Sequence, residues 1–263
     1  MLSRVNILFR LFGIDFRILF RSLSAVPWFI SSYLKFRNKY KFNSNEKEFS
    51  FGNLYPCLLD RSDKSGIAKG HYFHQDLLVA QNIYEARPDK HVDIGSRVDG
   101  LVAHVASFRE IEVIDIRDQQ SNLKNIKFIK MDMMHNIDAK YIDYCDSISC
   151  LHALEHFGLG RYGDDICVEG YFKGVDNISK LLKRDGIFYL SVPIGPQRIE
   201  FNAHRVFSIN YILKIVSDEF QLNSFAYIDD KGNLHADVKL DNEDTEQNFG
   251  CVYGCGVFEL KKK

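Results

Sequence analysis

Three residues that could do chemistry stand close together in the stretch LHALEHFG, namely His152, Glu155 and His156. On an α-helix, two histidines four residues apart lie on one face and can bind a single metal ion. The adjacent glutamate could then act as a general base, as in metal-dependent peptidases. If the stretch instead follows a β-strand, the two histidines need not share a face. The surrounding elements therefore decide which chemistry the motif can do.

Composition excludes several classes of protein. The chain has 263 residues and a net charge of -1, so it has no overall charge attraction to nucleic acid. Its six cysteines form no C-x-x-C pair. In a chain of this length they predict reduced, mostly buried thiols rather than a disulfide framework, and hence a cytoplasmic protein.

Residues 1–41 differ from the rest in charge. They hold eight Lys or Arg and one acid, a charge of +7, which leaves -8 for the remainder of a chain with net charge -1. Charges interrupt the apolar residues too often for a membrane-spanning helix, and no signal-peptide cleavage site follows. We predict a basic amphipathic helical extension and linker over residues 1–50, and a main domain over residues 51–263.

Two interpretations of the basic extension remain open. A basic, aromatic helix can lie on an anionic membrane, which would make the protein peripheral on the inner face of that membrane. Alternatively, the helix packs on its parent domain or on a second copy in a homodimer.

Beyond the linker, short apolar runs alternate with helical patterns. This alternation predicts an α/β fold with a parallel, doubly wound sheet, completed by a final pair of strands resembling a hairpin. The expected strands are residues 91–94, 111–116, 126–131, 146–151, 187–193, 222–228 and 253–260. The expected helices are residues 74–87, 98–108 and 171–182, with one more beginning at Ser208. The motif at His152 thus follows a strand, which disfavours a peptidase.

Candidate ligand-binding residues, most of them polar, lie at or just after the ends of the first three strands, at the sheet edge where ligands of such folds bind. They are Asp93, Gly95, Ser96 and Arg97, then Asp115 and Ile116, then Asp132. An acid that ends the second strand can accept both hydroxyls of a ribose. The loop after the first strand reads GSRVDG and lacks the glycine pattern that a dinucleotide pyrophosphate requires. The pattern favours an adenosine-containing ligand without phosphate and disfavours a nicotinamide-dependent oxidoreductase.

The run from His91 to Pro193 resembles the class I S-adenosylmethionine-dependent methyltransferases. HVDIGSRVDG, VIDI, FIKMDMM and LLKRDGIFYLSVP are similar to successive motifs of that superfamily. The resemblance implies a Rossmann-like sheet with an antiparallel final strand. It also implies that the seven strand-end residues bind S-adenosylmethionine. Arg97 and Asp99 stand where the superfamily usually has glycines, so the resemblance implies either a different turn, with Gly100 in the tight position, or lost binding.

Finer motifs resemble a family of bacterial and nematode proteins that carries a domain of unknown function. The motifs are GHYFHQD, HVDIGSRVDG, HFGLGRYGD and FNAHRVF. Bacterial genes of this family often accompany surface-polysaccharide genes. The resemblance implies O-methylation of a sugar or glycan intermediate, a small-molecule or glycan substrate.

Within this fold, His152, Glu155 and His156 lie beside the expected position of the methyl group and are the candidate catalytic residues. Small-RNA 2'-O-methyltransferases bind a divalent metal with a similar motif and a later histidine. That resemblance implies a metal site made of His152, Glu155, His156 and His204. Proton transfer without metal, and simple capping of the following loop, remain alternatives.

Substrate contacts are expected from a glycine-rich loop and from residues after the fifth strand. Arg161 and Tyr162 lie in the loop, and Arg198, His204 and Arg205 follow the strand. The guanidinium groups suit a phosphate or carboxylate. A lid over the cofactor is expected from three residues before the sheet, Tyr72, His74 and Gln75.

The sequence therefore predicts a methyltransferase that uses S-adenosylmethionine. The alternative is a non-catalytic protein that uses the same fold to bind partners or to support an assembly at the membrane.

Overall fold

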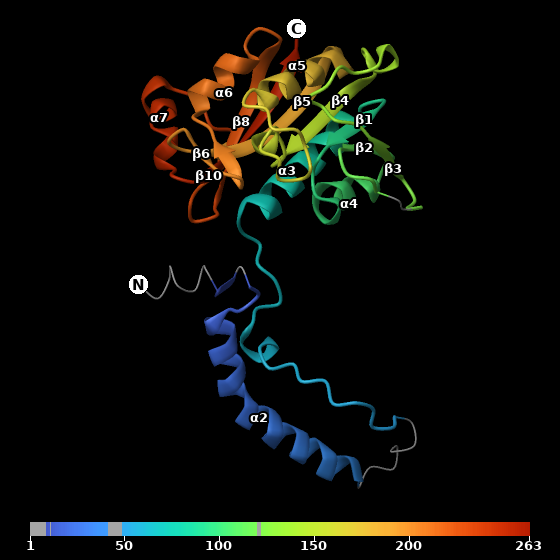
Figure 1. Ribbon diagram of the computed structural model, residues 1–263, viewed down its shortest axis with the longest axis vertical. Coiled ribbons are helices and arrows are strands. Elements are labelled where there is room, and N and C mark those ends of the chain that lie inside the picture. The colour runs from blue at the N-terminus through green and yellow to red at the C-terminus, as the bar shows by residue number, and fades with distance from the viewer. Residues whose placement is uncertain (1–8, 11, 42–48, 120–121) are drawn as a thin grey trace. The chain divides into compact units, whose positions relative to one another are not determined.

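The computed structural model describes residues 9–10, 12–41, 49–119 and 122–263. Contacts divide the chain into two units, residues 1–67 and 68–263 (Figure 1). Parts of the predicted extension and linker, residues 1–8, 11 and 42–48, lie outside the described residues.

The first unit is built on α2 (Phe16–Lys41), which contains Pro27. A following segment includes a 3₁₀ turn at Asp60–Ser62, and the Arg21 side chain of α2 donates to the Ser62 hydroxyl and the Asp63 carboxylate, both at 2.7 Å. The ring of Phe51 meets those of Tyr33 and Phe36 edge-on, at 6.3 and 6.0 Å between centroids. In the described part of the chain, no helix has both the length and the apolar character that a membrane span requires.

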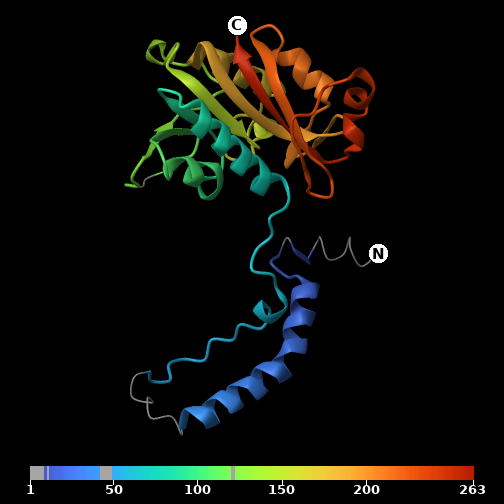
Figure 2. The ribbon, with the colours of Figure 1, turned by 180° about the vertical axis from the view of Figure 1, so that it is seen from behind.

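The second unit is one eight-stranded sheet with helices on both faces, which Figures 1 and 2 show from opposite sides. The strand order is β3-β2-β1-β4-β5-β10-β8-β9, and β10 runs antiparallel to both neighbours. The strands are β1 (His91–Ile94), β2 (Ile111–Asp115), β3 (Ile126–Lys130), β4 (Cys145–Leu151), β5 (Leu182–Ile194), β8 (Phe220–Ile228), β9 (Leu234–His235) and β10 (Gly254–Lys262). The predicted doubly wound sheet and antiparallel final strand are confirmed.

Two apolar cores hold the helices to the sheet. The first core lies under α5 and α6, and the second lies under α3 and α4. The helices of this unit are α3 (His71–Ala86), α4 (Ala103–Ala106), α5 (Gly170–Leu181), α6 (Ile209–Val216) and α7 (Asn242–Glu246). On α5, Val175, Ile178 and Leu181 repeat at helical spacing and are almost completely buried. Burial of each such side chain stabilises the fold by roughly 1.5–3 kcal/mol.

Several details differ from the sequence prediction. Residues 98–108 form a π-helical turn (Val98–Val102) before the short α4, because Gly100 breaks the regular helix. A β-carbon on Gly100 would lie 2.3 Å from a carboxylate oxygen of Asp76, so any other residue there would force the Asp76 side chain to move. The fifth strand, β5, begins at Leu182 and not at the predicted residue 187, and the RDG sequence lies in a bulge within it. A small hairpin of β6 (Arg198–Glu200) and β7 (His204–Val206) was not predicted.

Candidate functional site

A cavity of about 560 Å³ lies at the carboxyl ends of the parallel strands. This edge includes the point between β1 and β4 where the strand order reverses, the position at which open α/β sheets bind ligands. Most of the predicted site residues line it: Gly95, Arg97, Asp115, Ile116, Asp132, His152, Glu155, His156, Arg161, Tyr162 and His204. The fold therefore brings residues from five separate segments to one space.

Asp93 and Ser96 do not line this cavity; they shape the loop that does. The Asp93 carboxylate accepts hydrogen bonds from the Ser96 backbone and hydroxyl and from the Ser149 hydroxyl, at 3.0, 2.7 and 2.6 Å. Burial raises the pKa of Asp93 to about 6. Gly95 lies between them with φ 67°, in the left-handed region that favours glycine. The loop is thus held from below and presents Gly95 to the cavity.

Arg97 lines the cavity in an ion pair with Asp99. Its Nε and Nη2 donate to the two carboxylate oxygens of Asp99 at 2.9 and 2.7 Å, and its guanidinium lies 5.4 Å from the ring centroid of Tyr72. Both charged side chains are mostly exposed, so the pair can open at small cost.

Asp115, the last residue of β2, accepts three hydrogen bonds from Arg117. The backbone nitrogen, Nε and Nη2 of Arg117 lie 2.8, 2.9 and 2.6 Å from its oxygens. The carboxylate is buried, whereas Arg117 is half-exposed. Asp132 accepts from the Met134 backbone at 2.8 Å and lies 3.0 Å from the Nδ1 of His135. Both acids face the cavity with part of their hydrogen-bonding capacity already in use.

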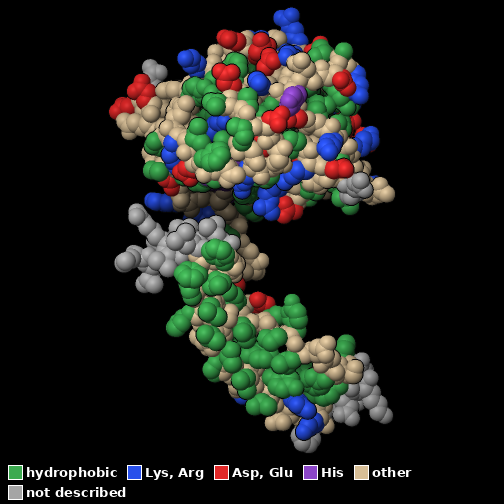
Figure 3. Space-filling view, in the orientation of Figure 1, with side chains coloured by type: hydrophobic (Ala, Val, Ile, Leu, Met, Phe, Trp, Pro, Cys, Tyr) green, Lys and Arg blue, Asp and Glu red, His purple; other side chains and the backbone are tan. Residues whose placement is uncertain are grey.

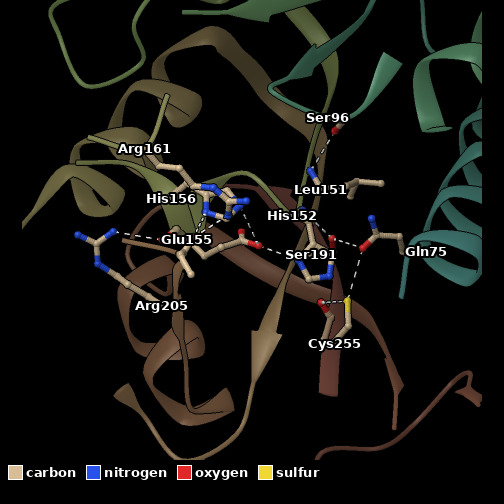
Figure 4. Close-up of polar contacts among 12 residues, drawn as sticks. Gln75, Ser96, Leu151, His152, Glu155, His156, Arg161, Ser191, Arg205 and Cys255 are labelled. Carbon is tan, nitrogen blue, oxygen red and sulfur yellow. Dashed lines mark hydrogen bonds and ion pairs between the residues drawn. The ribbon is translucent and has the colours of Figure 1, made fainter. Parts of the chain in front are cut away.

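The motif that follows β4 does not lie in an α-helix. His152 adopts φ 49°, an unusual conformation for a residue with a side chain, and Leu154–His156 form a single 3₁₀ turn. The His152 Nδ1 lies 2.7 Å from the Glu155 Oε1, and both side chains are almost fully buried (Figure 4). Burial alone would lower the pKa of His152, but its interactions with Cys255 and Glu155 raise it well above the usual value.

His156 makes a different set of contacts. Its Nδ1 lies 2.7 Å from the backbone oxygen of Ala203 and must donate a proton to it. Its Nε2 lies 3.8 Å from the Glu155 Oε1. Burial lowers the pKa of His156, so the ring is neutral near pH 7. The neutral ring then carries its free lone pair on Nε2, at the wall of the cavity.

Buried polar atoms without partners concentrate here. Among the described residues, four side-chain polar atoms are buried without a hydrogen bond. Three of them belong to residues that line the cavity, and they are the His152 Nε2, the Glu155 Oε2 and the His204 Nε2. The His204 Nε2 lies 3.3 Å from a carboxylate oxygen of Glu200, without the geometry of a hydrogen bond. Such atoms are rare in folded proteins and point to a bound group.

The predicted metal ligands are not gathered around one point. The described residues contain a single group of three side chains whose ligand atoms lie within 4.8 Å of one another, and it consists of His71, His152 and Cys255. The predicted set is not brought together because the 3₁₀ turn directs His156 toward Ala203, while His204 faces Glu200.

Two of the predicted anion-binding arginines do not line the cavity. The Arg205 guanidinium is buried and donates to the backbone oxygens of Glu155, Phe157 and Val168, so it holds the loop after β4 in place. Arg198 donates to the carbonyl oxygens of Pro196 and Val252 and pairs with Glu200. Both arginines lie outside the cavity for the same reason: each donates to backbone carbonyl oxygens of loops, which have no partner within a strand or helix.

Arg161 and Tyr162, in contrast, do line the cavity. The Arg161 Nη1 donates to the same Ala203 oxygen that His156 uses, at 2.8 Å. The Tyr162 ring meets the His156 ring edge-on, at 5.3 Å between centroids. Of the expected lid, Tyr72 lines the cavity, whereas Gln75 is buried beneath it, where its Oε1 accepts from the Ser191 hydroxyl. His74 does not line the cavity.

Sequence reasoning missed three residues near the motif: His71, Tyr253 and Cys255. Tyr253 lines the cavity, and its ring lies 5.0 Å from that of His204. The GHYFHQD motif could have indicated His71, but it contains two histidines. Their positions on α3 place His71 next to His152, whereas His74 is not part of this group. Tyr253 and Cys255 carried no local signal, because they reach the site only through the position of β10 in the sheet.

Comparison with known families assigns residues 96–249, more than half of the chain, to a model described as "Caenorhabditis protein of unknown function, DUF268". The chain belongs to this family. No match was found among curated protein sequences.

Solved structures with the same fold include enzymes of two kinds. One is the 1,6-didemethyltoxoflavin-N1-methyltransferase of Burkholderia thailandensis, solved with its substrate and S-adenosylhomocysteine; it is 13% identical, with a TM-score of 0.51 over 74% of this chain and 79% of that one. Another is the [4+2]-cyclase SpnF, 11% identical, with a TM-score of 0.50 over 75% of this chain and 88% of that one. At these identities the likeness establishes the Rossmann-like, methyltransferase-type fold of the DUF268 chain, and not its reaction.

Proposed function

We propose that this protein transfers a methyl group from S-adenosylmethionine to a hydroxyl of a sugar or glycan intermediate. The observation that carries the proposal is one cavity in which the strand-end acids Asp115 and Asp132 face the same space as the His156 Nε2. The B. thailandensis methyltransferase, which shares the fold, holds S-adenosylhomocysteine, and this supports the choice of cofactor.

The cofactor would lie across the ends of β1, β2 and β3. Asp115 would accept the ribose hydroxyls and Asp132 the adenine amine, with Gly95 and Ile116 lining the space between. S-adenosylmethionine supplies an electrophilic methyl group on a sulfonium. Arg97 would separate from Asp99 and form an ion pair with the methionyl carboxylate. One ion pair replaces another, and the released Asp99 side chain is exposed to water.

The acceptor hydroxyl would lie beside His156. Its oxygen forms the new bond to the methyl carbon as the carbon–sulfur bond breaks, and the His156 Nε2 takes the hydroxyl proton. The Ala203 carbonyl holds the ring in the required tautomer, and the Glu155 carboxylate stabilises the imidazolium that forms. Tyr162 and Arg161 offer a ring face and a cation to a sugar or an attached phosphate.

Two measurements test this proposal. Calorimetry of the full-length protein with S-adenosylmethionine should give one site per chain. Radiolabelled S-adenosylmethionine, incubated with a panel of nucleotide sugars and oligosaccharides, should label at least one of them. Failure to bind the cofactor would overturn the proposal.

A role without methyl transfer, such as binding a glycan without catalysis, is the second candidate. SpnF has the same fold and is a [4+2]-cyclase, so this fold does not by itself require methyl transfer. This candidate would be favoured if the protein binds the cofactor and a glycan of the panel but transfers no label to any acceptor.

We also propose that α2 binds the anionic inner face of the membrane. Its cations are Arg17, Arg21, Lys35, Arg37, Lys39 and Lys41, and it contains no acid. Exposed apolar side chains cover much of its surface (Figure 3). Five of them, Leu19, Phe20, Leu23, Ile30 and Leu34, recur at helical spacing and are 49–75% exposed. A second copy of α2 would bring like charges together, which favours lipid over a homodimer.

Vesicle co-sedimentation tests the membrane contact. Full-length protein should bind phosphatidylserine vesicles at low salt, with each Lys or Arg near the surface contributing about 1 kcal/mol, and salt should weaken the binding. Leu23→Ser should reduce binding, whereas Ile166→Ser, at an exposed apolar residue of the other unit, should not. Equal binding to neutral vesicles, or none to either, would contradict the proposal.

A further inference from the structure

A cluster of three potential metal ligands adjoins the cavity wall. His71 is the first residue of α3, His152 follows β4, and Cys255 lies in β10. One ligand atom of each lies within 4.8 Å of the other two. The three elements are distant in sequence, and only His152 also lines the cavity. The cluster is therefore a product of the fold, and the proposed methyl transfer gives it no role.

The orientation of His152 is that of a metal ligand. Its Nδ1 is bound to the Glu155 carboxylate at 2.7 Å, and its Nε2 is buried and has no hydrogen-bond partner. Histidines that bind metals usually donate their other ring nitrogen to a carboxylate or carbonyl in this way.

His71 and Cys255 complete the cluster. The His71 ring stacks on that of His152, with 5.2 Å between the ring centroids and 6° between the planes. Cys255 is fully buried, with its Sγ 3.5 Å from the Gln75 Oε1. Parallel rings direct their lone pairs alongside each other. His71, which is only partly buried, is the side chain that must rotate to meet an ion.

We propose that His71, His152 and Cys255 bind a Zn²⁺ ion. Two imidazoles and one thiolate form a nitrogen and sulfur set that suits zinc and not magnesium or calcium. Binding would release the Cys255 thiol proton to solvent, and Glu155 would hold His152 in place. Three protein ligands leave a fourth position for water or a hydroxyl. This inference does not depend on the proposed methyl transfer.

Titration with Zn²⁺ and with Co²⁺ tests the site directly. Full-length protein, stripped of metal by a chelator, should bind one ion per chain. The cobalt form should show the visible bands of a tetrahedral site and a thiolate-to-cobalt charge-transfer band. Cys255→Ser should remove that band. His71→Ala should weaken zinc binding at least as much as Glu155→Gln does, because it removes a ligand and not the group behind one. Glu155→Gln should weaken binding by about 10- to 100-fold, as expected when the carboxylate behind a ligating histidine is lost.

Matched controls separate the site from general effects. Cys57→Ser, at an exposed cysteine of the first unit, and His74→Ala, at a neighbouring histidine of α3, should leave binding and spectrum unchanged. If Cys255→Ser does not fold, His71→Ala at its partly exposed position decides the question. Absence of stoichiometric binding by the wild type, or an unchanged cobalt spectrum in Cys255→Ser or His71→Ala, would overturn the proposal. Calorimetry with S-adenosylmethionine remains a separate readout, so loss of either function is distinguishable.

Discussion

We call the part of the cavity proposed to hold the cofactor the cofactor half, and the part proposed to hold the methyl acceptor the acceptor half. These two halves satisfy their polar groups in opposite ways. In the cofactor half, carboxylates are already paired with arginines close in sequence, as in Asp99 with Arg97 and Asp115 with Arg117. In the acceptor half, the His152 Nε2 and the Glu155 Oε2 are buried without partners. The first arrangement lets ligand groups replace side chains that can move into water. In the acceptor half, no mobile side chain has to be displaced, because the unpaired atoms are buried away from water and held in place.

This difference predicts where substitutions cost most. Electrostatic interactions are stronger in the buried half, where water does not screen them, and a preorganised group there acts on the reacting atoms directly. Substitutions in the acceptor half should therefore reduce the rate, and those in the cofactor half should reduce affinity by smaller factors.

The largest effect is expected at His156. His156→Ala should lower kcat on a labelled acceptor by about 10²- to 10⁴-fold, the usual contribution of a positioned general base. The affinity for S-adenosylmethionine, measured by calorimetry, should change little. His235→Ala, at a partly exposed histidine of β9 that does not line the cavity, is the control. A loss of cofactor affinity equal to the loss of rate would remove the distinction between the two halves.

A smaller effect is expected at Asp115. Asp115→Ala should weaken cofactor binding by about 1.5–3 kcal/mol, or roughly 10- to 150-fold, because charge-assisted hydrogen bonds to the ribose are lost. Thermal unfolding of the same variant checks that the loss of the Arg117 pair has not disturbed β2. Unchanged affinity in a folded variant would refute the assignment of this acid.

The pH dependence of the rate should report His156. Burial depresses its pKa below 6.5, with Arg161 and His152 lowering it further and Glu155 opposing them, while the Tyr162 ring packs against it. The neutral ring is the base, so kcat should rise about tenfold per pH unit below that pKa and be flat above it. A rate that instead rises through the neutral range would place the base elsewhere.

The smallest effect is expected at Asp99. It is exposed, and exposed ion pairs contribute little, so Asp99→Ala should change cofactor affinity by less than about fivefold. Removal of this competitor frees Arg97, so the change should be toward tighter binding. Calorimetry beside Asp115→Ala compares two Arg–Asp pairs of the same spacing that differ in burial. A loss of affinity in Asp99→Ala as large as that in Asp115→Ala would show that Asp99 itself contributes to cofactor binding.

Sequence alone determined the main elements of the second unit. Apolar runs of strand length alternating with helical patterns leave few folds other than a doubly wound sheet, because each face must be covered. The acids at the ends of β2 and β3 followed from the same pattern, since strand ends meet at one edge of a parallel sheet. The position of the cavity was thus predictable from local periodicity.

Tertiary structure decided the contacts of the acceptor half. Cys255 is far from His152 in sequence, and only the insertion of β10 between β5 and β8 brings the thiol to that histidine. Arg205 was predicted to bind substrate, but its guanidinium donates to backbone carbonyl oxygens of the loop after β4. No sequence pattern specifies the path of that loop. Periodicity reports which face of an element is buried. It does not report strand order or loop conformation, which depend on interactions between residues far apart in the chain.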